Sequence, residues 1–172
     1  MLLLCIGRET ALDFKEGFSR WIQGCEKLAV MGVGNPLRRD DGVGVEIVKQ
    51  LSYKVPEHVR LFECGLVPED FILDVEAFQP THILIIDAAE LNAEPGEATF
   101  FPPQKIGSAT FSSHVVPLSL FVSMIKEATE ARVAVLGIQP ASTEFGEELT
   151  PNLRVTVKEV AEAISKALKE IY

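Results

Sequence analysis

The segment 27–53, "KLAVMGVGNPLRRDDGVGVEIVKQLSY", contains the change of pattern that decides the fold. It begins with a short apolar run typical of a buried strand and passes through the loop "GVGNPLRRDDGVG" at 32–44. It then places Val45, Val48 and Leu51 at helical spacing. A strand that leads directly into a helix is the repeating unit of parallel α/β proteins. The segment therefore predicts a sheet whose first strand enters its helix through a glycine-rich turn.

The same alternation continues along the chain. Four more apolar runs occupy 59–65, 81–88, 97–102 and 132–139, and helical patterns occupy 68–78, 116–128 and 151–171. The run at 97–102 follows a short turn, "NAEPGE", after the preceding strand, so we expect it to run antiparallel. The expected fold class is α/β with three layers: a mostly parallel five-stranded twisted sheet with one antiparallel strand and helices on both faces. In the last helix, the apolar positions include Val155, Val160, Ile164 and Leu168.

A single domain accounts for the chain, because 172 residues bury a full core and no repeat, low-complexity tract or linker divides residues 1–172. Residues 1–26 precede the first strand of the sheet as an extra N-terminal segment. We expect this segment to contain a short strand or coil followed by a helix, with Trp21 and Ile22 as packing anchors.

Composition narrows the class of partner and the compartment. The formal net charge of −9 and the absence of a Lys/Arg cluster argue against nucleic acid or an anionic membrane as a partner. The three cysteines are far apart and form no CxxC pair, which fits a reducing compartment. The start "MLLLCIG" lacks a basic region and is too short for a signal peptide, and no window approaches the length of a membrane span. We therefore expect a cytoplasmic protein.

Carboxylates follow two of the predicted strands at the edge where sites form. In an open parallel sheet, ligands bind outside the carboxyl ends of the strands, where the strand order reverses. Asp87 ends the run "HILII" and would be costly to bury without a cation, a proton or a partner. Of the adjacent pair after the first strand, we assign helix capping or first-turn support to Asp40 and the site role to Asp41.

Position separates the three histidines. His58 and His82 lie at the beginning of strands and therefore at the opposite edge of the sheet, whereas His114, in "FSSHVVP", falls in a loop that can reach the carboxyl edge. Together, Asp41, Asp87 and His114 offer two oxygens and one nitrogen. This set suits a borderline divalent ion such as nickel, zinc or manganese, and the absence of thiolate favours weak or transient binding.

Other site chemistries fit less well. A dinucleotide fingerprint needs a third glycine where this loop has Leu37, and no Walker-type phosphate loop is present. No Gly-x-Ser-x-Gly elbow occurs. Ser112 and Ser113 beside His114 form a weak nucleophile–base candidate, and Cys64 is the one cysteine near a strand exit.

Four motifs, in order and in register, resemble those of the nickel–iron hydrogenase maturation endopeptidases, especially the branch that processes hydrogenase-3-type large subunits. They are "GVGNPLRRDDGVG", "ILIIDAAELNAEPGE", "FSSHVVPL" and "LGIQP". The resemblance covers the chain from about Leu28 through the C-terminal helix. Two departures are the "ECG" at the end of the second strand, where relatives commonly have "DGG", and the segment 1–26.

The resemblance implies an endopeptidase that removes the C-terminal extension of a nickel–iron hydrogenase large-subunit precursor after nickel insertion. In that family an acidic residue of the first loop, the Asp of the third strand and a loop His bind a divalent ion, and they correspond to Asp41, Asp87 and His114. The resemblance further implies an aspartyl-type activity that activates the hydrogenase. The nickel would be supplied by the substrate, with zinc or cadmium able to take its place in vitro.

Two more residues are candidates for substrate contact at the cleft rim. Asn35 and Gln139 are placed to hydrogen-bond substrate backbone, although turn formation for Asn35 and strand-end capping for Gln139 are equally consistent with the sequence. The alternative functions are a metal-dependent hydrolase of a small molecule, a non-enzymatic nickel-site chaperone and, least favoured, a nucleotide-binding module.

Overall fold

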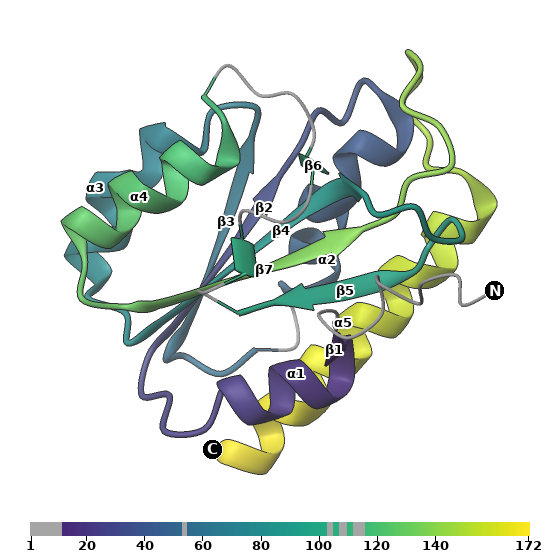
Figure 1. The fold of residues 1–172 in the computed structure, drawn as a ribbon. Coiled ribbons are helices and arrows are strands. Elements are labelled where there is room, and N and C mark those ends of the chain that lie inside the picture. The colour runs from purple at the N-terminus through teal and green to yellow at the C-terminus, as the bar shows by residue number, and fades with distance from the viewer. Residues whose placement is uncertain (1–11, 53–54, 103–104, 107–109, 112–115) are drawn as a thin grey trace, which may run out of the picture.

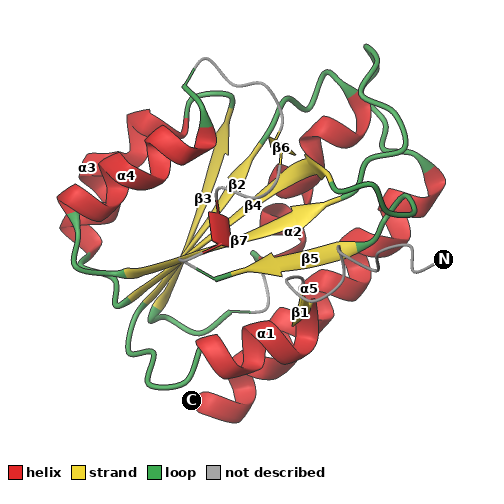
Figure 2. Cartoon of the chain, viewed as in Figure 1, coloured by secondary structure: helices red, strands yellow, loops and turns green. Residues whose placement is uncertain are grey.

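The structure, a computed structural model, describes residues 12–52, 55–102, 105–106, 110–111 and 116–172. A twisted sheet in the order β1-β5-β7-β4-β2-β3 forms its centre, and a further short strand, β6, pairs with β4 (Figure 1). Helices cover both faces of the sheet (Figure 2). This is the three-layer α/β fold that the sequence predicts.

All five predicted strands are present. The parallel strands are β2 (Leu28–Val33), β3 (Val59–Gly65), β4 (His82–Glu90) and β7 (Arg132–Ile138), and β5 (Ala98–Phe101) runs antiparallel to β7, as expected. The two-residue strands β1 (Leu12–Asp13) and β6 (Thr110–Phe111) add to this sheet by antiparallel pairing with β5 and β4.

The helices follow the predicted order. They are α1 (Phe14–Trp21), α2 (Val43–Leu51), α3 (Ile72–Phe78), α4 (Leu118–Ala128) and α5 (Pro151–Ile171), with 3-10 turns η1 (Arg39–Gly42) and η2 (Pro68–Phe71) before α2 and α3. In the extra N-terminal segment, β1 and α1 form as expected, and the Trp21 and Ile22 side chains are buried. None of the helices in the described ranges has the length and apolarity needed to span a membrane.

Alternation along the strands divides the core between the two faces. Leu28 and Val30 of β2 pack in one cluster with α1, α2 and α5, whereas Ala29 and Met31 pack in the other with α3 and α4. Both clusters are closed by apolar helix faces, which is why the strands read as continuous apolar runs.

The structure corrects the sequence in two details. Val155 of α5 is exposed and Val157 faces the core instead, because the buried residues recur every three or four positions from Leu153 and Val155 lies outside that stripe. The helix that contains Val45 and the helix expected from 68 are each preceded by a 3-10 turn, η1 and η2, so α2 begins at Val43 and α3 at Ile72.

Candidate active site

The strand order reverses between β2 and β4. From β2 the chain continues to β3 on one side and then returns to β4 on the other. The loop after β2 contains Asp41 in η1, and the carboxyl end of β4 contains Asp87. Because η1 also contacts β4, both aspartates lie at the switch point, where open α/β sheets bind ligands.

Asp87 is fully buried within β4 and pairs in register with Gly137 of β7. The pleat of the strand puts its side chain on the same face as Ile83 and Ile85, which pack in the cluster formed with α3 and α4. The carboxylate therefore belongs to the α4 side of the sheet edge, and α4 is the first helix after His114 in the sequence.

Asp41 is held by the turn that precedes it. Its Oδ2 accepts a hydrogen bond from the backbone N–H of Asn35 (3.0 Å), and the side chain is 8% exposed. Asn35 Oδ1 in turn accepts from the backbone N–H of Leu37 (2.9 Å), which closes the turn. These bonds give Asn35 the turn-forming role that the sequence left open, and a substrate contact by its amide stays a prediction.

Two glycines bring the loop and α2 close to the sheet. A Cβ on Gly34, whose φ is +130°, would overlap the carbonyl oxygen of Asp41. A Cβ on Gly44 would overlap the carbonyl oxygens of Ile86 and Val33. Gly44 thus provides the close packing of helix on strand that a dinucleotide fingerprint assigns to its third glycine, although it occurs later in the chain.

Asp40 has a different role from its neighbour. Its carboxylate is fully buried and accepts four hydrogen bonds: from the backbone N–H groups of Ala141 (2.9 Å), Ser142 (3.0 Å) and Thr150 (2.8 Å), and from the Thr150 hydroxyl (2.8 Å). Asp40 therefore has a structural role, as expected, but the prediction that it caps its own helix is wrong. Asp40 instead fixes the distant segment 140–150 against the loop after β2.

The third predicted ligand, His114, and the candidates Ser112 and Ser113 lie outside the described residues. The described chain on either side of them is fixed at this edge: Phe111 of β6 pairs with Ala89, two residues beyond Asp87, and Val116 packs against the core cluster of α3 and α4. Within the described ranges, no group of three or more His, Cys, Asp or Glu side chains is arranged to hold a metal ion. The structure therefore brings two of the three predicted residues to one edge.

Gln139 directly follows β7 and its side-chain amide is bonded within the chain. Oε1 accepts from the backbone N–H of Leu91 (2.7 Å), and Nε2 donates to Glu90 Oε1 (3.1 Å) and to the carbonyl of Pro140 (3.2 Å). The side chain is buried, so these bonds favour the strand-end capping role over a contact with substrate.

The competing nucleophile and the other histidines fit the site poorly. Burial raises the pKa of the Cys64 thiol, which disfavours the reactive thiolate. His82 is the first residue of β4 and is therefore at the amino edge, as the sequence predicts.

Glu69 is an acid at the carboxyl edge that sequence reasoning did not select. It lies in η2 just after β3, and its Oε2 is shielded from solvent with no hydrogen-bond partner among the described residues. The helix-start pattern "PED" concealed it, because acids in a first turn ordinarily stabilise the helix dipole.

A three-layer α/β protein with buried carboxylates at its switch point is the class that this geometry defines, and comparison with known proteins narrows it. The family model described as hydrogenase maturation protease, HycI, matches residues 45–170. A Methanocaldococcus jannaschii protein assigned to the same proteases is 36% identical over 132 residues, which cover 72% of this chain and 78% of that protein. The chain belongs to the hydrogenase maturation protease family and is therefore a peptidase.

Solved structures agree with this assignment. The nickel–iron hydrogenase maturation protease HycI from Thermococcus kodakarensis superposes with a TM-score of 0.81 at 31% identity, covering 88% of this chain and 98% of that one. The hydrogenase 3 maturation protease structure gives a TM-score of 0.69 at 27% identity, covering 79% and 87%. The Escherichia coli hydrogenase 3 maturation protease is 29% identical over 129 residues.

Proposed function

We propose that this protein is a cytoplasmic endopeptidase that removes the C-terminal extension of a nickel–iron hydrogenase large-subunit precursor after nickel has been inserted. Membership of the hydrogenase maturation protease family supports the reaction class. The observation that supports the site is that Asp41 and Asp87 both lie at the switch point of the sheet.

Nickel enters this proposal as part of the substrate. Two carboxylates and one imidazole, from Asp41, Asp87 and His114, form a donor set that suits a borderline divalent ion, so zinc or cadmium would also bind in vitro. Contact with the ion would align the neighbouring peptide bond in the site. Since an empty precursor lacks this contact, the difference in affinity makes cleavage conditional on nickel insertion.

The chemistry is hydrolysis of one peptide bond. The ion or one of the aspartates polarises the attacking water or the peptide carbonyl, oxygen adds to the carbonyl carbon, and the C–N bond breaks as the leaving nitrogen takes a proton. Asp40 takes no part in these steps, because both of its carboxylate oxygens accept hydrogen bonds from the segment 140–150.

One experiment tests the whole proposal. Purified protein is mixed with nickel-loaded precursor and, separately, with nickel-free precursor, and the products are weighed by mass spectrometry. We expect a shortened chain from the loaded precursor alone. Equal cutting of both forms would refute the nickel checkpoint, and binding without shortening would show a chaperone.

A substitution tests the role of His114, which lies outside the described residues. We expect His114→Ala to keep the wild-type melting temperature and to leave nickel-loaded precursor uncut. Wild-type cleavage rates in this variant would remove His114 from the site.

A further inference from the structure

The segment 140–150, which connects β7 to α5, projects from the carboxyl edge of the sheet (Figure 1). It carries Phe145, whose side chain is 82% exposed, and it lies beside Leu37, which is 57% exposed in the loop after β2. We call Leu37 and Phe145 the rim patch. Large apolar side chains gathered at the edge of a site mark a surface that contacts something else.

The segment that holds Phe145 is fixed to the site loop. Asp40 binds it near both ends, at Ala141, Ser142 and Thr150. Between these points, the backbone N–H of Arg39 donates to the Gly146 carbonyl (2.8 Å), and that of Gly146 donates to the Leu37 carbonyl (2.9 Å). The exposed Phe145 therefore stands on a segment that is braced by hydrogen bonds, and these bonds set its position relative to Asp41.

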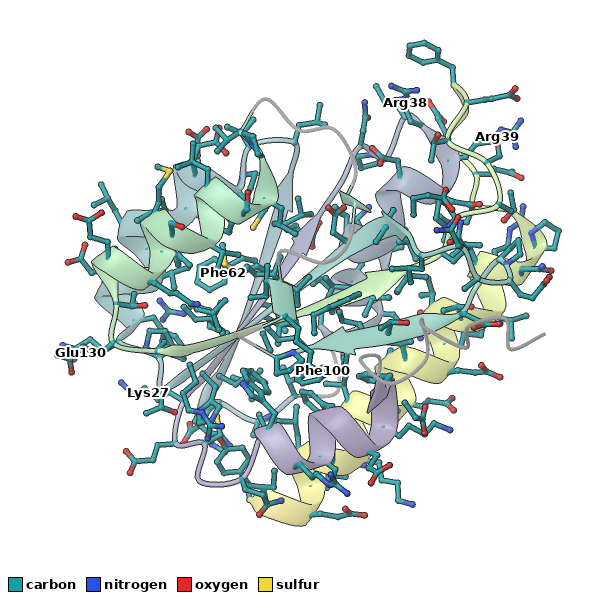
Figure 3. The ribbon with its side chains drawn as sticks, viewed as in Figure 1. Lys27, Arg38, Arg39, Phe62, Phe100 and Glu130 are labelled. Carbon is teal, nitrogen blue, oxygen red and sulfur yellow. The ribbon has the colours of Figure 1, made fainter. Side chains whose placement is uncertain are left out.

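Arg38 orients the exposed ring. Its Nε donates to the Thr143 carbonyl (2.9 Å), and its guanidinium carbon lies 5.6 Å from the centroid of the Phe145 ring. Figure 3 shows Arg38 and Arg39 beside the projecting segment. A guanidinium over an aromatic face stabilises the ring where it stands without covering it from solvent.

We propose that the rim patch is a docking surface for the precursor protein, which it contacts through an apolar surface next to the end that is cut. This inference rests on the proposed function. The patch is continuous with the site, because Leu37 belongs to the same turn as Asp41 and the braced segment is tied to that turn. Exposed aromatic and arginine side chains are the usual anchors of protein interfaces, and a braced segment loses little freedom on binding.

The proposal divides recognition into two parts. Asp41 and Asp87 bind the nickel, whereas the rim patch binds the protein that carries the nickel. Loss of the patch therefore weakens binding of the precursor whether or not nickel is present, and it leaves the chemical step of the bound precursor unchanged.

The test uses the full chain and nickel-loaded precursor, with kcat and KM measured for each variant. We expect Phe145→Ala to raise KM about tenfold with kcat unchanged, as for loss of an interface anchor. Leu37→Ala raises KM less, and Phe145→Leu restores most of the wild-type KM. The matched control is Leu73→Ala: Leu73 is 75% exposed in α3, which lies across the sheet from the segment 140–150 (Figure 1), and its loss should leave both constants unchanged.

Three outcomes would overturn the docking surface. The first is a KM for Phe145→Ala equal to that of wild type. The second is an equal rise in KM for Leu73→Ala. The third, from light scattering, is a wild-type dimer that becomes a monomer in Phe145→Ala, which would assign the patch to a second copy of this chain. If wild type does not cut the precursor at all, the proposed function fails, whereas normal cutting with no effect of Phe145→Ala rejects only the docking surface.

Discussion

Polar groups hold the chain together at both edges of the parallel sheet, but the two edges use different groups. At the amino edge, the Thr81 hydroxyl accepts from the backbone N–H groups of Glu26 (3.0 Å) and Lys27 (3.2 Å), and the Tyr172 hydroxyl donates to the Cys25 carbonyl (2.7 Å). These neutral bonds join strand starts and the chain's C-terminal end. They close the fold at this edge.

At the carboxyl edge the polar groups include buried acids. Asp40, Asp41 and Asp87 are all buried there, and a single loop supplies two of them. Helix N-termini face this edge, and their partial positive charge favours carboxylates there. In the proposed function, Asp41 and Asp87 contact the ion of the substrate, whereas Asp40 stabilises the fold as the polar groups of the amino edge do. Four predictions test this difference.

The largest effect is expected at Asp41. Asp41→Asn keeps an oxygen that can accept from Asn35 N–H but removes the charge, so we expect cleavage of nickel-loaded precursor to fall about a thousandfold with an unchanged melting temperature. Single-turnover cleavage rates measure this fall. Glu63→Gln, an exposed acid at the end of the neighbouring strand β3, is the control and should cut normally. A loss shared by both variants would show that overall charge, not the site, matters.

Asp40→Ala should act on stability instead. It leaves three partly buried backbone N–H donors and the Thr150 hydroxyl without their acceptor, so we expect the free energy of unfolding to drop by about 4 kcal/mol. Denaturant titration measures the drop, and Glu144→Ala, an exposed acid in the same segment, should cost almost nothing. Equal stability of Asp40→Ala and wild type would contradict the bracing role.

Glycines at the two edges provide a third comparison. Gly44→Ala at the carboxyl edge would force α2 away from Ile86 and Val33, at a cost of about 2 kcal/mol in unfolding free energy. Gly24 at the amino edge has φ +75°, and an added methyl group would meet no atom of the described residues within 4 Å, so Gly24→Ala should cost only about 1 kcal/mol from backbone strain. Thermal melts of both variants decide the order, and a reversed order would show that α2 is not closely packed.

The smallest effect concerns acid sensitivity at the amino edge. Burial, and then the charge of Arg132, lower the pKa of His82 from its ordinary 6.5. The folded protein therefore keeps His82 neutral where the unfolded chain binds a proton, so stability falls as pH drops from 6.5 towards the folded pKa. His82→Phe, which keeps a ring against Trp21, should lose less melting temperature between about pH 8 and pH 5. Parallel acid profiles for the two proteins would exclude this contribution.

Much of the fold follows from local pattern. The five strands, the antiparallel direction of 97–102 and the span of the helix 151–171 are all present as the sequence predicts. Strand alternation and helical spacing repeat within a few residues, so they can be read without partners. The orientation of Val155 could not be predicted from this spacing, because several apolar positions of one helix are candidates for the same core.

The candidate site was predictable in its position and less so in the role of each residue. The rule that sites form after parallel strands selects Asp41 and Asp87, and the structure brings both to the switch point. The adjacent aspartates look alike in sequence, yet one binds Ala141 and Thr150, more than 100 positions away. Such partners are visible only once the chain is folded.

The succession of strands and helices along the chain follows from residues close together in sequence, and the edge at which the acids collect follows from that succession. The family follows from several such motifs in the right order. Three features required the folded chain: Asp40 braces the segment 140–150, Gln139 caps a strand end, and Phe145 is exposed beside the site. Hydrogen bonds and burial join residues remote in sequence, so no local pattern encodes which partner a polar side chain finds.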